Sequence, residues 1–500
     1  MSPEFAIALS IVIPLVGAVL IGLCDRWPDL RETVTMITAG ALFAVVVMIL
    51  PQVASGERPE LVLLELFPGL EIKFTVEPLG MLFALIASGL WIVTSIYSIG
   101  YMRGHEEENQ TRFYVCFAIA LAAAMGIAYS GNMLTLFICY EILTLSTYPL
   151  VTHAGTNEAM RAGRVYLGIL IGTSIGFLLL GIIITWSIAG TLDFTQGGIL
   201  TGKADGAVIG GLLLLYVFGI GKAALMPFHR WLPAAMVAPT PVSALLHAVA
   251  VVKAGVFTVL KVTVYIFGID LLRDIDATIW LQYLAAATIL ISSLVAMTKD
   301  NLKARLAYST ISQLSYIVLG AMLVSQSSVI GGGMHIATHA FGKITLFFCA
   351  GAYMVAAHKT EISQLKGIGR VMPVTTGAFL IGSLSIIGLP PFGGLWSKWY
   401  LALGALEADK LIFVIVLLVS SLLNVAYLLP IPIRGFFGKA DASDAPGGHS
   451  AHVSSGAGDS PIREAPLPCL IAITITSIGC VALFFFSDSI YELLKPIVAP

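Results

Sequence analysis

A small set of ionisable side chains lies within long apolar stretches of the sequence. The set consists of Glu141, Lys222, His247, Lys253, Lys261, His335, His339, Lys343 and Lys398. A Lys or Asp at the centre of a bilayer costs about 2.5–3.5 kcal/mol on insertion scales, so such residues normally face a bundle interior and mark an ion pathway. Carboxylate, ammonium and imidazole groups exchange protons, and the set therefore indicates proton transfer.

Glu141 and Lys222 are expected to act together beside an interrupted helix. Glu141 is the one acid that falls centrally in an apolar segment, TLFICYEILTLSTYPLV, and it needs a cation nearby. Lys222 lies in GIGKAALMPFHRWLP, where Pro227 removes a backbone donor and breaks the helix. In lipid such a break is tolerated only where protein or water satisfies the freed groups, which predicts a hydrated cavity. The alternative is a static Glu141–Lys222 ion pair that locks two helices.

Two lysines and a histidine share the next apolar segment. Lys253 lies in SALLHAVAVVKAGVF, too far from either helix end for its ammonium to reach the membrane surface easily. His247 precedes it by six residues and either joins a proton relay or only hydrogen-bonds a carbonyl group. Lys261 is close to the outer end of the segment, and we expect it to anchor there.

A stripe of titratable groups follows in MHIATHAFGKITLFF. His335, His339 and Lys343 recur every four residues, which aligns them along one helix face over about 12 Å of rise. The HxxxH spacing also occurs in metal sites, but the Glu of HExxH is missing and no third ligand is evident. We therefore predict a proton relay and no metal site, because imidazole both accepts and donates protons near neutral pH.

Lys398 belongs to a second predicted helix break. It follows Pro390 and Pro391 in IIGLPPFGGLWSKWY, where the prolines and glycines interrupt the helix. Two interrupted helices, each with a buried lysine, are typical of paired inverted repeats with a transport path between them.

The composition places these residues in a membrane protein. Of 500 residues, 58% are hydrophobic and only 11% are charged, whereas a soluble domain carries about 25% charged residues. Lys and Arg total 27 against 29 Asp and Glu, so no basic surface for nucleic acid is expected. The 6 cysteines show no CxxC or metal-ligand spacing, and no haem, iron–sulfur, zinc or other cofactor is predicted.

Runs of roughly 20 apolar residues divide the chain into about fourteen membrane-crossing helices. They lie near 4–24, 34–50, 78–102, 112–130, 132–151, 163–190, 206–228, 241–267, 277–298, 302–325, 329–357, 373–406 in two halves, 411–437 and 467–487. The predicted fold is an all-α polytopic membrane protein with two inverted five-helix repeats, each containing a broken helix. The predicted parts are three N-terminal helices (1–110), the two repeats (111–267 and 268–437), a flexible cytoplasmic loop (438–466) and a last helix (467–500). The segment 52–77 is compatible with a short hairpin that caps the helices.

Alternate loops differ in positive charge. One side collects 16 Lys and Arg residues and the other 6, so the first side is predicted to be cytoplasmic and both termini to face outward. We expect the chain in the cell inner (plasma) membrane.

Several motifs resemble one family. YEILTLSTYPLV, GKAALMPFHRWLP, SALLHAVAVVKAGVF, RLAYSTISQLSYIVLG, HIATHAFGK and GLPPFGGLWSKW, which lie between about residues 77 and 437, are similar to the antiporter-like subunits of respiratory NADH:quinone oxidoreductase (complex I), membrane-bound hydrogenases and Mrp-type cation/proton antiporters. The resemblance implies that Glu141 and Lys222 control proton affinity, that Lys253, His335 and His339 carry protons sideways, and that Lys398 communicates with the next subunit. Lysine at 398 and the compact length look most like the D subunit of an Mrp-type antiporter.

The resemblance implies a function and partners. The chain is expected to be a proton-translocating subunit of a multisubunit Na+(monovalent cation)/H+ antiporter, bound to other integral membrane subunits, and not an enzyme by itself. The first alternative is a proton-pumping subunit of a complex I-type oxidoreductase or a hydrogenase, which would be part of a redox-driven translocase. A second alternative is a non-conducting scaffold, and a third, a quinone-binding subunit, has little support in the residues.

Overall fold

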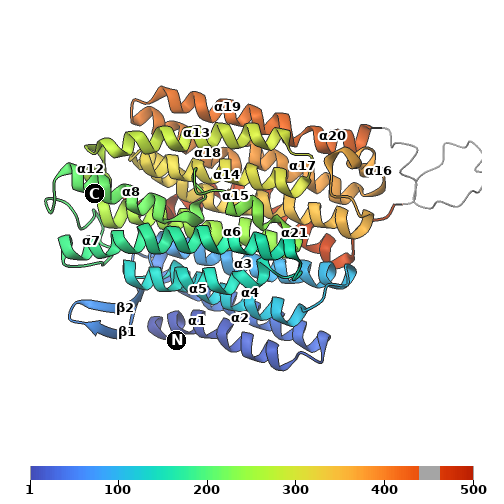
Figure 1. Ribbon diagram of the computed structural model, residues 1–500, viewed down its shortest axis with the longest axis horizontal. Helices are drawn as coiled ribbons and strands as arrows, with labels where there is room; N and C mark the ends of the chain where they lie inside the picture. The colour runs from blue at the N-terminus through green and yellow to red at the C-terminus, as the bar shows by residue number, and fades with distance from the viewer. Residues whose placement is uncertain (1, 439–461, 499–500) are drawn as a thin grey trace, which may run out of the picture.

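The computed structural model describes residues 2–438 and 462–498, and in these ranges the chain forms a bundle of long helices that run side by side along its longest dimension (Figure 1). Most of the predicted loop 438–466 lies outside the described residues. In the first half the helices are α1 Pro3–Leu23, α2 Pro28–Ala54, α3 Pro78–Gly104, α4 Gln110–Ala128, α5 Met133–Val151, α6 Asn157–Thr173, α7 Leu180–Ala189, α8 Gly206–Gly219, α9 Trp231–Ala234, α10 Thr240–Ala244 and α11 Val251–Val262.

The second half is also helical. Its helices are α12 Ile269–Arg273, α13 Asp276–Thr298, α14 Leu302–Met322, α15 Gln326–Ala357, α16 Ile368–Val371, α17 Pro373–Ile387, α18 Gly394–Glu407, α19 Leu411–Leu428, α20 Pro430–Phe437, α21 Leu467–Phe485 and α22 Ser487–Leu494. Wider π-helical turns join some of these helices, η1 Ser174–Leu179, η4 Leu245–Val249 and η5 Thr263–Phe267. Short 3-10 turns occur at η2 Gly221–Ala223, η3 Ala235–Val237, η6 Ile362–Leu365 and η8 Lys495–Val498.

Many of the helices are long and apolar enough to cross a bilayer. Among the described residues 11 helical spans meet this condition, and α8 and α17 are shorter apolar helices. The prediction of an all-α polytopic membrane protein is confirmed. The count of about fourteen crossings and the limits of the repeats stay predictions.

The segment 52–77 forms the expected hairpin at one end of the bundle. Strands β1 Glu60–Phe67 and β2 Leu70–Thr75 pair antiparallel, with Glu60 opposite Thr75. In Figure 1 the hairpin lies at the left, at the same end as α12 and the start of α1. Lys73 ties the hairpin to the bundle, because its Nζ lies 2.8 Å from Asp193 Oδ2 and its backbone N–H donates to Thr135 Oγ1.

Both predicted helix breaks are present. Helix α8 ends at Gly219, and after the short turn η2 the chain does not become helical again until Trp231, so the break includes Pro227. Helix α17 ends at Ile387 and α18 begins at Gly394, with Pro390 and Pro391 between them. Proline explains both interruptions, because it has no N–H for the helical hydrogen-bond ladder.

A glycine contact holds the first break against the centre of the bundle. The span 240–267, which contains α10, η4, α11 and η5, is the most deeply buried of the apolar spans in the described chain. A Cβ atom added at Gly255 of α11 would lie 2.3 Å from the carbonyl carbon of Lys222 and 2.3 Å from the nitrogen of Ala223. Only glycine therefore lets α11 approach the break this closely.

We predict that Gly255→Ala destabilises the protein by about 1–3 kcal/mol, the usual cost of overpacking a tightly packed site. The measurement is the midpoint of thermal unfolding of the purified protein in detergent. Gly377→Ala is the matched control, because nothing lies within 4 Å of a Cβ atom at that position of α17. Alanine is favoured over glycine inside a helix, so the control midpoint should stay equal or rise. Equal midpoints for the two variants would contradict the predicted role of Gly255.

Candidate functional site

Lys222 is fully buried at the first break, and its ammonium is held by helix α5. Its Nζ donates to the backbone oxygen of Tyr140 at 2.9 Å and to Thr144 Oγ1 at 2.6 Å, and it lies 3.1 Å from the centre of the Tyr140 ring. The backbone of the break is satisfied by protein groups as well. Lys222 N–H donates to Tyr140 Oη at 3.1 Å, and Trp231 Nε1 donates to the oxygen of Gly221 at 3.0 Å.

Glu141 is on the same helix but does not form the direct contact with Lys222 that the sequence suggested. Both of its carboxylate oxygens are buried and have no hydrogen-bond partner among the described residues. The reason is angular, because successive residues of an α-helix are about 100° apart, and Tyr140 and Thr144 occupy the face that meets the break. Glu141 as a whole residue is half-buried, and the next residue, Ile142, is 43% exposed, so this side of α5 borders the outer surface of the chain.

Lys253 and His339 form the central contact of the site. Lys253 Nζ lies 2.5 Å from His339 Nδ1, and both side chains are buried. His335 lies one turn before His339 on α15, and the centres of the two rings are 5.8 Å apart. Its Nδ1 lies 2.9 Å from Ser397 Oγ on α18, so the two histidines connect α11 to α18.

Tyr316 of α14 joins His335 to the lysine at the second break. Its ring is stacked on His335, with centroids 5.5 Å apart, and Lys398 Nζ lies 5.1 Å from the centre of the same ring. Lys398 donates to the backbone oxygen of Ile387, the last residue of α17, at 2.9 Å and to Ser421 Oγ at 3.1 Å. These side chains are successive neighbours in space, and we call them together the lysine–histidine file: Lys253, His339, His335, Tyr316 and Lys398.

Two buried ring nitrogens along the file have no protein partner. They are His335 Nε2 and His339 Nε2, which have no hydrogen-bond partner among the described residues. Buried polar groups are normally hydrogen-bonded to protein or to ordered water. We therefore expect water along the file.

Lys343 and His247 are buried beside the file. Lys343 Nζ donates to Ser309 Oγ at 2.5 Å, and Tyr427 Oη donates to the same oxygen at 2.8 Å. His247 lies in the π-helical turn η4, and the centre of its ring is 4.7 Å from the centre of the Phe347 ring. Neither nitrogen of the His247 ring has a hydrogen-bond partner among the described residues. The carbonyl-bonded alternative for His247 is therefore wrong.

The expectation that Lys261 anchors at the membrane surface is also wrong. Lys261 is 1% exposed, its Nζ lies 2.7 Å from Glu77 Oε1, and it donates to the backbone oxygen of Ser130 at 2.7 Å. Position near a helix end predicted an exposed ammonium, but the whole span from Thr240 to Phe267 is buried and offers no lipid-facing side.

Sequence reasoning missed Tyr316, Ser397 and Thr144, which provide the contacts between the charged groups. Tyr316 lies in the motif RLAYSTISQLSYIVLG, and Ser397 directly precedes Lys398. Hydroxyl side chains are common in buried helices, so their type alone gives no signal. Only their place next to the buried lysines and histidines could have indicated them.

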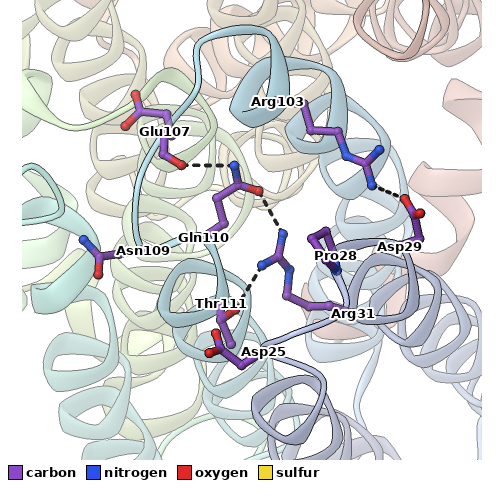
Figure 2. Close-up of a pocket in the computed structure, with 9 residues that line it drawn as sticks. All are labelled: Asp25, Pro28, Asp29, Arg31, Arg103, Glu107, Asn109, Gln110 and Thr111. Atoms are coloured by element: carbon purple, nitrogen blue, oxygen red, sulfur yellow. Dashed lines mark hydrogen bonds and ion pairs between the residues drawn. The ribbon is translucent and has the colours of Figure 1, made fainter.

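A large open cavity lies away from the file. It has a volume of about 710 Å³ between the loops that join α1 to α2 and α3 to α4. Figure 2 shows its lining residues, Asp25, Pro28, Asp29, Arg31, Arg103, Glu107, Asn109, Gln110 and Thr111. Arg103 Nη2 lies 2.5 Å from Asp29 Oδ1, and Arg31 Nη2 donates to Gln110 Oε1 at 2.8 Å. The Arg103–Asp29 ion pair and the Arg31–Gln110 hydrogen bond fasten α2 to α3 and α4.

The comparisons with known proteins identify the family. A family model described as NADH:quinone oxidoreductase/Mrp antiporter, TM, matches residues 130–424, which include both breaks and the whole file. The chain belongs to this family. A second model, NADH-Ubiquinone oxidoreductase (complex I), chain 5 N-terminus, matches residues 69–114. The resemblance derived from the sequence motifs is confirmed.

Relatives of this antiporter-like chain include subunits of quinone oxidoreductases. NADH-quinone oxidoreductase subunit N of Desulforudis audaxviator is 33% identical over 433 residues, which cover 84% of this chain and 83% of that protein. NAD(P)H-quinone oxidoreductase chain 5 of Synechocystis sp. is 31% identical over 362 residues, which cover 69% of this chain and 51% of that protein. The chain thus matches about half the length of this second relative.

Two solved structures share the fold. A chain in the structure of the Mrp complex from Dietzia sp. DQ12-45-1b has a TM-score of 0.86 and 23% identity, with 100% of this chain and 97% of that chain covered. A chain of the membrane-bound sulfane sulfur reductase, an archaeal respiratory membrane complex, has a TM-score of 0.83 and 23% identity, with 98% and 97% covered.

We predict that Lys253 and His339 are energetically coupled. Groups in direct contact show interaction energies of about 0.5–3 kcal/mol in a double-mutant cycle. The cycle compares the unfolding free energies of Lys253→Met, His339→Leu and the double variant in detergent. Lys203→Met, which removes an exposed lysine in the loop before α8, is the control partner and should combine additively with His339→Leu. Additive behaviour of the Lys253–His339 pair itself would contradict the contact.

We predict that His153 makes stability fall in mild acid. His153 follows α5, outside the membrane-crossing helices, and burial lowers its pKa from the ordinary value of 6.5, while Glu107, 3.8 Å from its Nε2, partly opposes this shift. Below about pH 6.5 the unfolded chain therefore binds a proton that the folded chain does not, and unfolding becomes easier. The stability that neutral His153 contributes to the folded state is fully present above about pH 6.5, and it is lost as the pH falls toward the lowered pKa of the folded state. His153→Gln should lose less thermal stability than the wild type between neutral and acidic pH, and parallel curves would disprove the assignment.

Proposed function

We propose that the chain is a proton-translocating membrane subunit of a multisubunit Na+(monovalent cation)/H+ antiporter. The observation that carries the proposal is the lysine–histidine file, which runs from α11 across α15 to the second break. Its members are close neighbours. Lys253 Nζ lies 2.5 Å from His339 Nδ1, and the centres of the two histidine rings are 5.8 Å apart. A proton can therefore pass sideways within the bundle by short transfers.

Lys222 begins the path in this proposal. Its ammonium rests on Tyr140 and Thr144 of α5, and Glu141 is the neighbouring carboxylate on the same helix. Each change in charge at Glu141 alters the electrostatic energy of the ammonium, because Coulomb interactions are strong where water is scarce. The proton released from Lys222 moves through water to Lys253, which lies two residues before the Gly255 contact with the break. It then follows the file to Lys398.

The partners and the location belong to the same proposal. The similar folds in an Mrp complex and in a respiratory membrane complex support partner subunits that are themselves integral membrane proteins. We propose the plasma membrane as the location, with both termini on the outer side and Na+ transport at another subunit. The count of 16 Lys and Arg residues on one side against 6 on the other supports this orientation.

A second candidate is a proton-pumping subunit of a complex I-type oxidoreductase. The 33% identity to subunit N over 84% of the chain favours this candidate. The genes next to the gene for this chain distinguish the two candidate functions by the subunits that they encode. Small antiporter subunits support the Mrp-type complex, whereas a flavin or iron–sulfur subunit supports redox coupling.

We predict that Lys222→Ala or Glu141→Ala abolishes cation-dependent proton movement by the complex in sealed vesicles while the complex still assembles. The reason is that Lys222 holds the first proton of the proposed path and Glu141 controls the energy of its ammonium, so each variant removes a charge that the first transfer needs. Proton movement is measured with a pH-sensitive dye and divided by the amount of assembled complex. Lys203→Met, which removes an exposed lysine, is the control and should keep the wild-type rate.

Lys398→Met separates transport from a scaffold role. Under the proposal this variant also loses proton flux per assembled complex. If instead it changes only assembly or thermal stability, and Lys222→Ala transports normally, the chain is a non-conducting scaffold.

A further inference from the structure

A second buried ion pair lies at the hairpin end of the bundle, outside the file. Glu77, immediately before α3, is 7% exposed, and Lys261 of α11 is 1% exposed. Lys261 Nζ lies 2.7 Å from Glu77 Oε1, donates to the backbone oxygen of Ser130 and lies 4.5 Å from the centre of the Phe194 ring. Both charges are thus removed from bulk water.

The pair forms the inner wall of a cavity of about 160 Å³. At its outer side the cavity is lined by Arg58 and Gln196, which are exposed, and at its inner side by Glu77, Lys261 and Tyr265. A cavity of this size holds several water molecules, since one water occupies about 30 Å³ in the liquid. The cavity therefore connects the surface of the hairpin end to a buried carboxylate.

The same lysine lies on the helix that carries the file. Lys261 follows Lys253 by eight residues on α11, which corresponds to about 12 Å along the helix axis. The pair is thus placed between the cavity and the first member of the file.

Stability alone gives a weak reason for such a pair. A buried ion pair is often no more stabilising than apolar side chains of similar volume, because both charges must be desolvated. The neighbouring Lys73–Asp193 pair, which is partly exposed, already ties the hairpin to the bundle. The Glu77–Lys261 pair is therefore available for another task.

We propose that Glu77 and Lys261 form a proton-exchange gate through which the file communicates with the hairpin side of the membrane, an inference that rests on the proposed function. In the resting state Glu77 is a carboxylate and Lys261 an ammonium. A proton from water in the cavity binds Glu77 and neutralises it, and Lys261, which has lost its counter-charge, passes its proton through water toward Lys253. The proton on Glu77 then moves to the neutral amine of Lys261, which restores the ion pair after the net transfer of one proton.

The charges around the gate favour a proton over a metal cation. Arg58 and Lys261 give the cavity two positive groups against the single carboxylate of Glu77. Na+ must enter as a whole ion against this excess charge, whereas a proton passes along hydrogen bonds to the carboxylate. The other ionisable groups near the gate are the Tyr265 hydroxyl, which lines the cavity, and the Lys73–Asp193 pair of the adjacent hairpin.

The test compares Glu77→Gln and Lys261→Met with Lys73→Met in the assembled complex in vesicles. We expect the two gate variants to lose about 100-fold or more of the proton flux per complex, because a positioned proton-transfer group typically contributes about 10²–10⁴-fold to a rate. In Glu77→Gln we also expect half-maximal flux to require a more acidic solution on the hairpin side, because the carboxylate that collects protons is absent. Lys73→Met removes an ion pair at the same end of the bundle and should change neither quantity. Wild-type flux and an unchanged half-maximal pH in both gate variants would overturn the proposal.

Two further measurements cover variants that fail to assemble and separate this inference from the proposed function. In the wild-type complex, a hydrophobic carbodiimide, which reacts with protonated carboxyl groups, should label Glu77 faster as the pH falls, and peptide mass spectrometry detects the label. A Glu77 that is never labelled is a static ion-pair partner, which refutes the gate. Lys253→Met tests the file itself. If it loses flux while both gate variants keep it, only the gate is wrong, and if it keeps flux, the proposed function fails.

Discussion

The structure depends on one electrostatic constraint, which is that an ammonium group buried away from water needs acceptors for its protons. The buried lysines find these acceptors mainly at backbone oxygens of neighbouring segments. Lys398 donates to Ile387, the residue at which α17 ends, and Lys261 donates to Ser130, just beyond the end of α4. Lys222 donates to Tyr140 and lies itself in a helix break. Helix ends thus supply carbonyl oxygens for Lys398 and Lys261, and the first break brings Lys222 against the middle of α5.

Lys253 differs from these lysines because its close partner is a histidine ring nitrogen and not an oxygen atom. The contact of its Nζ with His339 Nδ1 joins two groups that can both hold the same proton. Moving that proton exchanges a charged lysine for a charged histidine without moving a helix. A rigid bundle, packed as closely as Gly255 against Lys222, is therefore compatible with transport. In the proposed mechanism the groups that a proton visits are fixed, and only the proton and the water between these groups move.

Sequence reasoning recovered the parts of this arrangement that follow from local chemistry. Proline located both breaks, and the four-residue spacing placed His335 and His339 on one face of α15, where their rings are neighbours. It failed where the answer depends on the partner helix. Hydropathy could not tell that Tyr140 rather than Glu141 would face Lys222, or that Lys261 would turn toward Glu77, because both outcomes are set by tertiary packing.

The position of the file in the bundle decides how charge can cross the chain. Helix α15 is 32 residues long and runs near the middle of the bundle (Figure 1). The two halves of the second broken helix, α17 and α18, pack against it, and the first break packs against α11. A path along the histidines of α15 is therefore shielded from lipid by other helices, and a proton on it has no direct exit to either surface. Such a path needs separate connections to the two sides of the membrane. Directional transport then depends on when each connection exchanges protons, because a path open to both sides at once would only dissipate the gradient.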